Sequence, residues 1–160
     1  TGTLFWAWQD VLKNQQQSKY KDWYAINSFD NQNTPQDEFS YTGWLGNNSL
    51  PELKKVAITT QRKVGHPYEG NIHPEVKAHI FAVTERWLKP RGNVQDGVDG
   101  FRLDVADQIG LGFWRDFRKV VRAINPDAYL VGEIWWEEWP DKLMNIAPYC
   151  KGDVFDAVMW

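Results

Sequence analysis

The chain has 160 residues, a formal net charge of −3 and 42% hydrophobic residues, which is enough apolar material for a buried core. This charge offers no basic surface of the kind that binds nucleic acid or an anionic membrane. No apolar run reaches the roughly 18 residues of a membrane span. The single Cys150 excludes an internal disulfide and leaves the cellular compartment undecided.

Residues 1–70 are rich in Asn, Gln, Lys, Trp and Tyr, and they show helical periodicity only from Phe5 to Leu12. Turn-forming residues interrupt the rest of this stretch, as at Thr34 and Pro35. We therefore predict a loop-rich excursion over residues 1–70. Long loops in compact domains usually serve a function.

From residue 71 onward the periodicity sharpens. Pro74 is suited to a first helical turn, and a helix from there should end near Pro90. Its apolar residues recur at helical spacing: Val76, Ile80, Val83 and Trp87. A second helix is predicted from Phe113 to Ile124, and a third, shorter one over Asp141–Ile146.

Three strands are predicted in the same half of the chain, over residues 98–104, 128–133 and 153–159. The second helix lies between the first two strands. The order strand, helix, strand is the unit that builds parallel sheets, so we expect an α/β fold for residues 71–160.

A carboxylate ends each of the first two predicted strands, Asp104 in one case and Glu133 in the other. Neighbouring parallel strands would hold the two side chains together at their C-terminal ends, where α/β barrels keep their active sites. A close carboxylate pair is what a retaining glycosidase uses as nucleophile and acid/base. Arg102 shares a strand face with Asp104, and its charge should lower the pKa of that carboxyl.

The segments around both carboxylates, Asp99–Ala106 and Gly132–Trp135, resemble the nucleophile and acid/base strands of the α-amylase family of retaining glycoside hydrolases, glycoside hydrolase family 13. Asp10–Leu12, Ser18–Tyr24 and Ser49–Leu53 are similar to the loop domain inserted after the third barrel strand of that family. Neopullulanase-like and cyclomaltodextrinase-like members are the nearest match. The motifs occur in the family's own order from about residue 5 to the C-terminus.

The resemblance implies a partial (β/α)8 TIM barrel, running from the loop domain after strand 3 (residues 1–70) through strand 6. A complete barrel needs about 250 residues and rarely fewer than roughly 200. We interpret the chain as a central part of a larger catalytic domain, whose third carboxylate should lie beyond Trp160. Uncovered strand edges predict self-association of the segment and no activity by itself.

The resemblance also implies site roles: Asp104 as nucleophile, Glu133 as acid/base, and Arg102, Trp135 and Trp136 as substrate-binding residues. Ile134 and the two tryptophans are expected to form an apolar pocket that keeps Glu133 protonated. Trp135, Trp136 and Trp139 would either stack on glucose rings or fill the core under a loop, and the sequence leaves both open.

No cofactor and no metal are predicted. The three histidines fit no zinc spacing and are interpreted as surface or capping residues. Relatives sometimes hold calcium in the loop domain, but this segment has no EF-hand spacing. The predicted partner is an α-glucan, and the predicted reaction is hydrolysis of α-1,4 bonds, with α-1,6 bonds as a second candidate. A glycosyl transferase of the same family and a non-catalytic sugar-binding protein are the alternatives.

Overall fold

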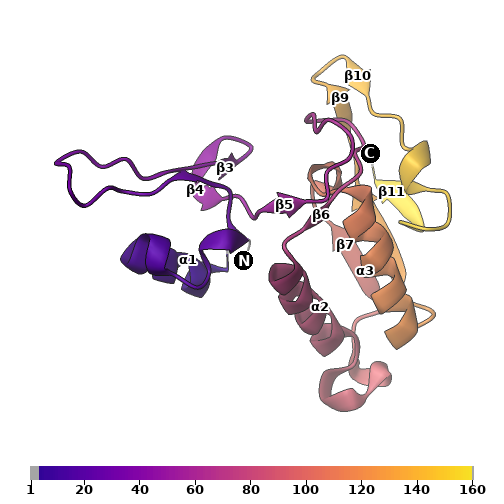
Figure 1. Ribbon diagram of the computed structural model, residues 1–160. Coiled ribbons are helices and arrows are strands. Elements are labelled where there is room, and N and C mark those ends of the chain that lie inside the picture. Colours follow the sequence, from indigo (N-terminus) through magenta and orange to yellow (C-terminus); the bar gives the residue numbers. More distant parts are fainter. Residues whose placement is uncertain (1–3, 160) are drawn as a thin grey trace. The chain divides into compact units, whose positions relative to one another are not determined.

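The computed structural model describes residues 4–159 (Figure 1). Contacts divide the chain into two compact units, Thr1–Lys55 and Val56–Trp160, and the short strand β5 (Lys55–Val56) spans the division. The sequence instead changes composition near residue 70. The interpretation of residues 1–70 as an inserted domain stays a prediction.

The first unit contains one α-helix and two small antiparallel sheets. Helix α1 (Phe5–Asn14) extends two residues past the predicted end. Strand β1 (Ile26–Ser28) pairs with β2 (Ser40–Tyr41), and β3 (Gly43–Trp44) pairs with β4 (Asn47–Pro51). Two 3₁₀ helices follow α1, at Gln15–Gln17 and Lys21–Trp23.

Aromatic rings form the core of this unit. Trp8 is buried, and its ring meets Tyr24 and Tyr41 edge-on at centroid distances of 4.9 and 4.7 Å. Trp23 is also buried and lies edge-on to Tyr20 at 4.7 Å. Edge-to-face contacts of this kind stabilise packing beyond the area that they bury, so short strands and loops can share one core.

The second unit contains a parallel three-stranded sheet with the order β11–β8–β7 (Figure 1). Its strands are β7 (Gly100–Leu103), β8 (Tyr129–Glu133) and β11 (Ala157–Met159), and both pairings are parallel. The predicted parallel α/β arrangement is therefore present. β6 (Asn71–Ile72) precedes the first helix of this unit.

Each observed strand is shorter than the predicted one, and for β7 and β11 the reason is local. Val98 donates its backbone N–H to the carbonyl of Trp87, at the end of the preceding helix, before β7 begins. Phe155 donates its backbone N–H to the carbonyl of Tyr149, in the preceding turn, at 3.0 Å, and β11 begins only at Ala157.

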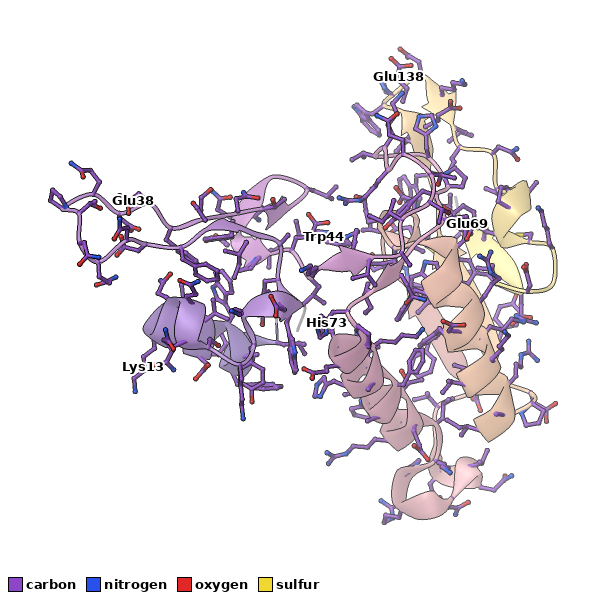
Figure 2. The ribbon with its side chains drawn as sticks, in the orientation of Figure 1. Lys13, Glu38, Trp44, Glu69, His73 and Glu138 are labelled. Atoms are coloured by element: carbon purple, nitrogen blue, oxygen red, sulfur yellow. The ribbon has the colours of Figure 1, made fainter. Side chains whose placement is uncertain are left out.

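Helices α2 (Pro74–Leu88) and α3 (Leu111–Ile124) lie side by side in this unit (Figure 1). Pro74 occupies the first turn of α2, as predicted. His73, labelled in Figure 2, caps the helix because its Nδ1 accepts from the Glu75 N–H at 3.2 Å. Four 3₁₀ helices complete the helical part of the unit: Pro90–Gly92, Val94–Asp96, Ala106–Gln108 and Ala147–Tyr149.

The predicted apolar stripe of α2 is correct only in part. Val76 is fully buried, but Val83 and Trp87 are exposed. Thr84 and Leu88 are buried in their place, and the Thr84 hydroxyl donates to the carbonyl of residue 80, one turn earlier, at 2.8 Å. A threonine satisfied by its own helix backbone can therefore occupy a core position that hydrophobicity alone does not predict.

The predicted third helix over Asp141–Ile146 is wrong. This segment belongs to an antiparallel hairpin of β9 (Trp136–Glu138) and β10 (Lys142–Leu143). Met144 is the one buried apolar residue between 141 and 146, so the segment has no apolar helix face to bury.

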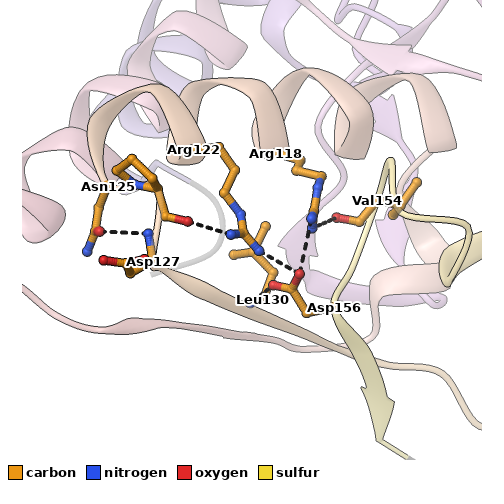
Figure 3. A network of polar contacts seen from close by, with 8 residues as sticks. Arg118, Arg122, Asn125, Asp127, Leu130, Val154 and Asp156 are labelled. Carbon is orange, nitrogen blue, oxygen red and sulfur yellow. Dashed lines mark hydrogen bonds and ion pairs between the residues drawn. The ribbon is translucent and has the colours of Figure 1, made fainter.

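An ion-pair network joins α3 to the start of β11 (Figure 3). The carboxylate of Asp156 accepts from Arg118 Nη2 at 3.1 Å and from Arg122 Nη2 at 2.5 Å, and its second oxygen accepts from the Leu130 N–H at 2.8 Å. This carboxylate links a helix and two strands through charge-assisted hydrogen bonds. Within residues 4–159, no helix has the length and apolar character needed to cross a membrane.

Candidate active site

Asp104 and Glu133 leave the sheet at the same edge. In the parallel register of β7 and β8, Leu103 lies beside Gly132. The next residue along each of these strands carries a carboxylate, Asp104 after Leu103 and Glu133 after Gly132. Gly132 has to be glycine, because a Cβ there would lie 2.3 Å from the ring of Phe155. That close approach lets an aromatic ring pack directly against the strand that ends in Glu133.

Arg102 binds both carboxylates through the two arms of its guanidinium. Nη1 lies 2.5 Å from Asp104 Oδ1, and Nη2 lies 3.0 Å from Glu133 Oε1. The sequence predicted only the contact with Asp104. A planar guanidinium fixes the directions of its donors, so the fork also fixes the two carboxyl groups relative to each other.

The pKa of Asp104 is lowered. The main cause is a side-chain hydrogen bond with Glu133; desolvation opposes the shift, while the hydrogen bond and charge of Arg102 reinforce it. Asp104 is therefore the carboxyl group that stays ionised, which is the state that a nucleophile requires.

Glu133 is less exposed than Asp104, with 17% of its side chain accessible against 70%. Its Oε2 accepts the backbone N–H of Val105 at 2.9 Å, so each of its oxygens meets a polar donor. The prediction of an apolar pocket around the Glu133 carboxyl is therefore wrong, because a guanidinium and a backbone N–H contact its oxygens. Ile134 is fully buried, and strand alternation turns it away from the face of Glu133.

Three tryptophans follow Glu133 on the β9–β10 hairpin. Trp135 is 38% exposed and Trp139 is 71% exposed, while Trp136 is half-buried between them. Trp136 meets Trp135 at a centroid distance of 6.3 Å and Trp139 at 4.7 Å, both edge-on. Ring faces on this hairpin remain accessible within the described residues, so they could stack on a sugar.

The loop before β6 reaches the turn that follows Asp104, a link that the sequence did not predict. Arg62 Nη2 donates to Gln108 Oε1 at 3.1 Å, and the Gly65 N–H donates to Asp107 Oδ2 at 3.2 Å. Gly65 has a φ of +79°, and a Cβ there would lie 2.3 Å from the carbonyl oxygen of Trp136. The loop is thus connected to both the turn and the tryptophan hairpin.

Histidines lie outside the carboxylate pair. His66 Nδ1 is 3.7 Å from Glu137 Oε1, and Lys142 binds the other oxygen of Glu137 at 2.9 Å. Across residues 4–159, no three or more His, Cys, Asp or Glu side chains are grouped so that they could hold a metal ion.

A parallel sheet with adjoining helices, and a carboxylate pair bridged by arginine at its C-terminal edge, is the arrangement of α/β-barrel enzymes that work with two carboxyl groups. The sequence profile of the alpha-amylase catalytic domain matches residues 1–160. The chain belongs to the alpha-amylase catalytic domain family.

Characterised relatives agree with this assignment. The chain is 35% identical over 158 residues to a cyclomaltodextrinase of Geobacillus thermopakistaniensis and, over an equal length, to neopullulanase 2 of Thermoactinomyces vulgaris. Each match covers 99% of this chain and 22% of the relative. The chain therefore spans about a fifth of the length of these relatives.

Solved structures show the same fold. The debranching enzyme of Nostoc punctiforme is 33% identical with a TM-score of 0.65, over 96% of this chain and 26% of that one. The cyclic α-maltosyl-(1→6)-maltose hydrolase of Arthrobacter globiformis is 28% identical with a TM-score of 0.63, over 96% of this chain and 28% of that one. The chain is folded like part of a barrel enzyme of this family.

Proposed function

We propose that the protein to which these residues belong hydrolyses α-glucosidic bonds with retention of configuration. Asp104 is the nucleophile and Glu133 the acid/base. The observation that carries the proposal is the single guanidinium of Arg102, which lies within 3.0 Å of one oxygen of each carboxylate. Such an arrangement favours the short carboxyl separation of about 5–5.5 Å used by retaining enzymes over the roughly 6.5–9.5 Å of inverting ones.

Each residue then has one task in a double displacement. The ionised Asp104 attacks the anomeric carbon while Glu133 passes its proton to the departing glycosidic oxygen, and a glucosyl ester forms on Asp104. Glu133, now ionised, takes a proton from water, which attacks the same carbon and releases Asp104. The hydrogen bond with Glu133, and after it the hydrogen bond and charge of Arg102, lower the pKa of Asp104 and keep it ionised between turnovers.

We further propose the substrate class and the position of the segment within the barrel. Relatives named cyclomaltodextrinase and neopullulanase support an α-glucan as the substrate. The proposed linkage is α-1,4, with α-1,6 as the second candidate. The three parallel strands correspond to barrel strands 4 to 6, and residues 1–70 to the domain inserted after strand 3. Trp135 and Trp136 are proposed to contact the sugar.

The 160 residues by themselves are proposed to be inactive. Catalytic groups must be held within about 0.5 Å of productive geometry by a rigid surround. In the described sheet β7 and β11 are the outer strands, and each has an edge on which another strand could pair. The segment should therefore self-associate and release no reducing sugar from starch or pullulan.

The test of the mechanism uses the full-length enzyme. Proton NMR during hydrolysis should show the α-anomer of the product first, and a 2-deoxy-2-fluoroglucosyl fluoride should label the peptide that contains Asp104. Asp104→Asn should lower kcat by about 10⁴-fold, because the covalent ester can no longer form.

Asp96→Asn is the matched control. Asp96 forms a comparable exposed ion pair with Arg91, at 3.1 Å, in a 3₁₀ turn away from β7. It should leave kcat unchanged. A β-anomeric first product would contradict the mechanism, and sugar binding without any hydrolysis would favour the sugar-binding alternative. Oligosaccharides longer than the substrate, formed faster than new reducing ends, would favour the glycosyl transferase.

A further inference from the structure

Val105, directly after Asp104, adopts a left-handed backbone conformation with φ of 46° and ψ of 48°. This region is unfavourable for β-branched residues because the branched Cβ crowds the backbone. Six non-glycine residues between 4 and 159 have positive φ, and Val105 is the only β-branched one. An unfavourable conformation persists only where the surrounding structure enforces it.

The enforcing contacts lie in the turn that follows. The Gln108 N–H donates to the Val105 carbonyl at 3.1 Å, closing the 3₁₀ turn. The indole of Trp114 donates to the Ala106 carbonyl at 2.8 Å, and the hydroxyl of Tyr68 donates to the Gln108 carbonyl at 2.9 Å. Both aromatic donors are buried, so the turn is held from α3 and from the loop before β6.

This enforced conformation directs the Val105 N–H at Glu133. The nitrogen lies 2.9 Å from Oε2, while Arg102 Nη2 lies 3.0 Å from Oε1. Two donors on the two oxygens fix the plane of a carboxyl group, whereas one donor leaves it free to rotate. A backbone N–H cannot follow a side-chain rotation, so it is the more rigid of the two.

We infer that Val105 is a positioning residue: its left-handed backbone holds the Glu133 carboxyl in the orientation from which the proton reaches the glycosidic oxygen. The inference rests on the proposed function, in which Glu133 is the acid. It adds that the turn after Asp104 is connected to Glu133 by a main-chain hydrogen bond, from the Val105 N–H to Oε2. The amino-acid sequence does not indicate this bond, because its donor is a backbone group.

A merely structural contact would slow the first step, transfer of the sugar to Asp104, on every substrate, whereas an orienting contact matters in that step only where the leaving group needs the acid. Maltotetraose has a poor leaving group and requires protonation; an α-maltosyl fluoride does not. Comparing the first-turnover rates of leaving-group release therefore separates orientation of the acid from general disorder of the site, because the later step that uses Glu133 as base is common to both substrates.

The experiment replaces Val105 in the full-length enzyme with its α-hydroxy acid analogue, an ester that deletes only the N–H. We expect the first-turnover rate on maltotetraose to fall by about tenfold or more, with KM unchanged and with first-turnover fluoride release within about twofold of wild type. The matched control is the same substitution at Ala147, whose N–H donates to Asn145 Oδ1 at 3.0 Å in an exposed turn.

An equal loss on both substrates, or no loss on maltotetraose, would overturn the inference. Should the ester variant fail to fold, Trp114→Phe tests the same point, since it removes the indole donor to the Ala106 carbonyl and keeps a ring in the core. It should lose activity severalfold on maltotetraose alone, and full activity would overturn the inference. The proposed function is tested separately: it fails if Glu133→Gln slows the first turnover equally on both substrates.

Discussion

Tryptophan has different surroundings in the two units. In residues 4–55, Trp8 and Trp23 are buried, each at 6% exposure, in clusters of aromatic rings. In residues 56–159, Trp135 and Trp139 are exposed at 38% and 71%, on the hairpin that follows Glu133. One residue type thus fills the core at Trp8 and Trp23, as Trp114 does in the second unit, and presents accessible surface on the hairpin after Glu133. The high aromatic content therefore has no single explanation.

Carboxylates show a similar contrast within the second unit. Asp156 is 17% exposed and accepts hydrogen bonds from two arginines and a backbone N–H, so both of its carboxylate oxygens are bonded within the fold. Asp104 is 70% exposed and shares one arginine with a second carboxyl group. We infer that a carboxylate whose oxygens are all hydrogen-bonded within the fold, such as Asp156, stabilises the fold. An exposed carboxylate that shares one arginine with a second carboxyl group, such as Asp104, still has an oxygen that a substrate can reach.

The largest expected effect on stability comes from removing a core tryptophan. Trp8→Ala should lower the free energy of unfolding by about 3–5 kcal/mol, because it leaves a cavity among Tyr24 and Tyr41. Urea denaturation followed by circular dichroism measures this change. Trp87→Ala, at an exposed position of α2, is the control and should change stability by less than about 0.5 kcal/mol. Equal losses would refute the assigned core role of Trp8.

The second prediction concerns the Asp156 carboxylate. Asp156→Asn should lower the free energy of unfolding by about 1.5–3 kcal/mol at neutral pH, since Arg118 and Arg122 lose a charged partner. Burial is the largest influence on this carboxyl and raises its pKa, but the Leu130 N–H and the two arginines together lower it.

The sign of the pH dependence follows from that lowered pKa. A carboxyl whose pKa is lower in the folded state stabilises the fold above the unfolded-state pKa, and this contribution is lost as pH falls through the folded-state value. The difference in stability between wild type and Asp156→Asn should therefore begin to shrink below about pH 4, near the unfolded-state pKa, and close as pH falls through the lower folded-state pKa. A constant difference down to pH 2 would show that packing, not charge, causes the loss.

The sequence predicted the parallel strands, both long helices and the position of Asp104 and Glu133 at strand ends, because apolar periodicity and strand alternation are local properties. It failed at Asp141–Ile146, where a hairpin replaces the predicted helix, and at Val83, where a predicted core position is exposed. It also gave no sign of the left-handed Val105, since valine disfavours that conformation and only distant residues enforce it. Contacts between distant segments account for what was missed at the site.

The smallest expected effect tests the exposed half of the tryptophan comparison. In the full-length enzyme, Trp139→Ala should raise KM for maltooligosaccharides about fivefold and leave kcat unchanged. The reason is that Trp139 follows Glu133 by about six residues, so its ring should stack on the bound sugar and take no part in proton transfer. Trp139→Phe should recover most of the loss, since it keeps a ring face but offers less area. The stability of Trp139→Ala should stay within about 0.5 kcal/mol of wild type, as expected for a side chain that is 71% exposed. A stability loss like that of Trp8→Ala, with KM unchanged, would assign Trp139 to packing and remove the distinction between the two sets of tryptophans.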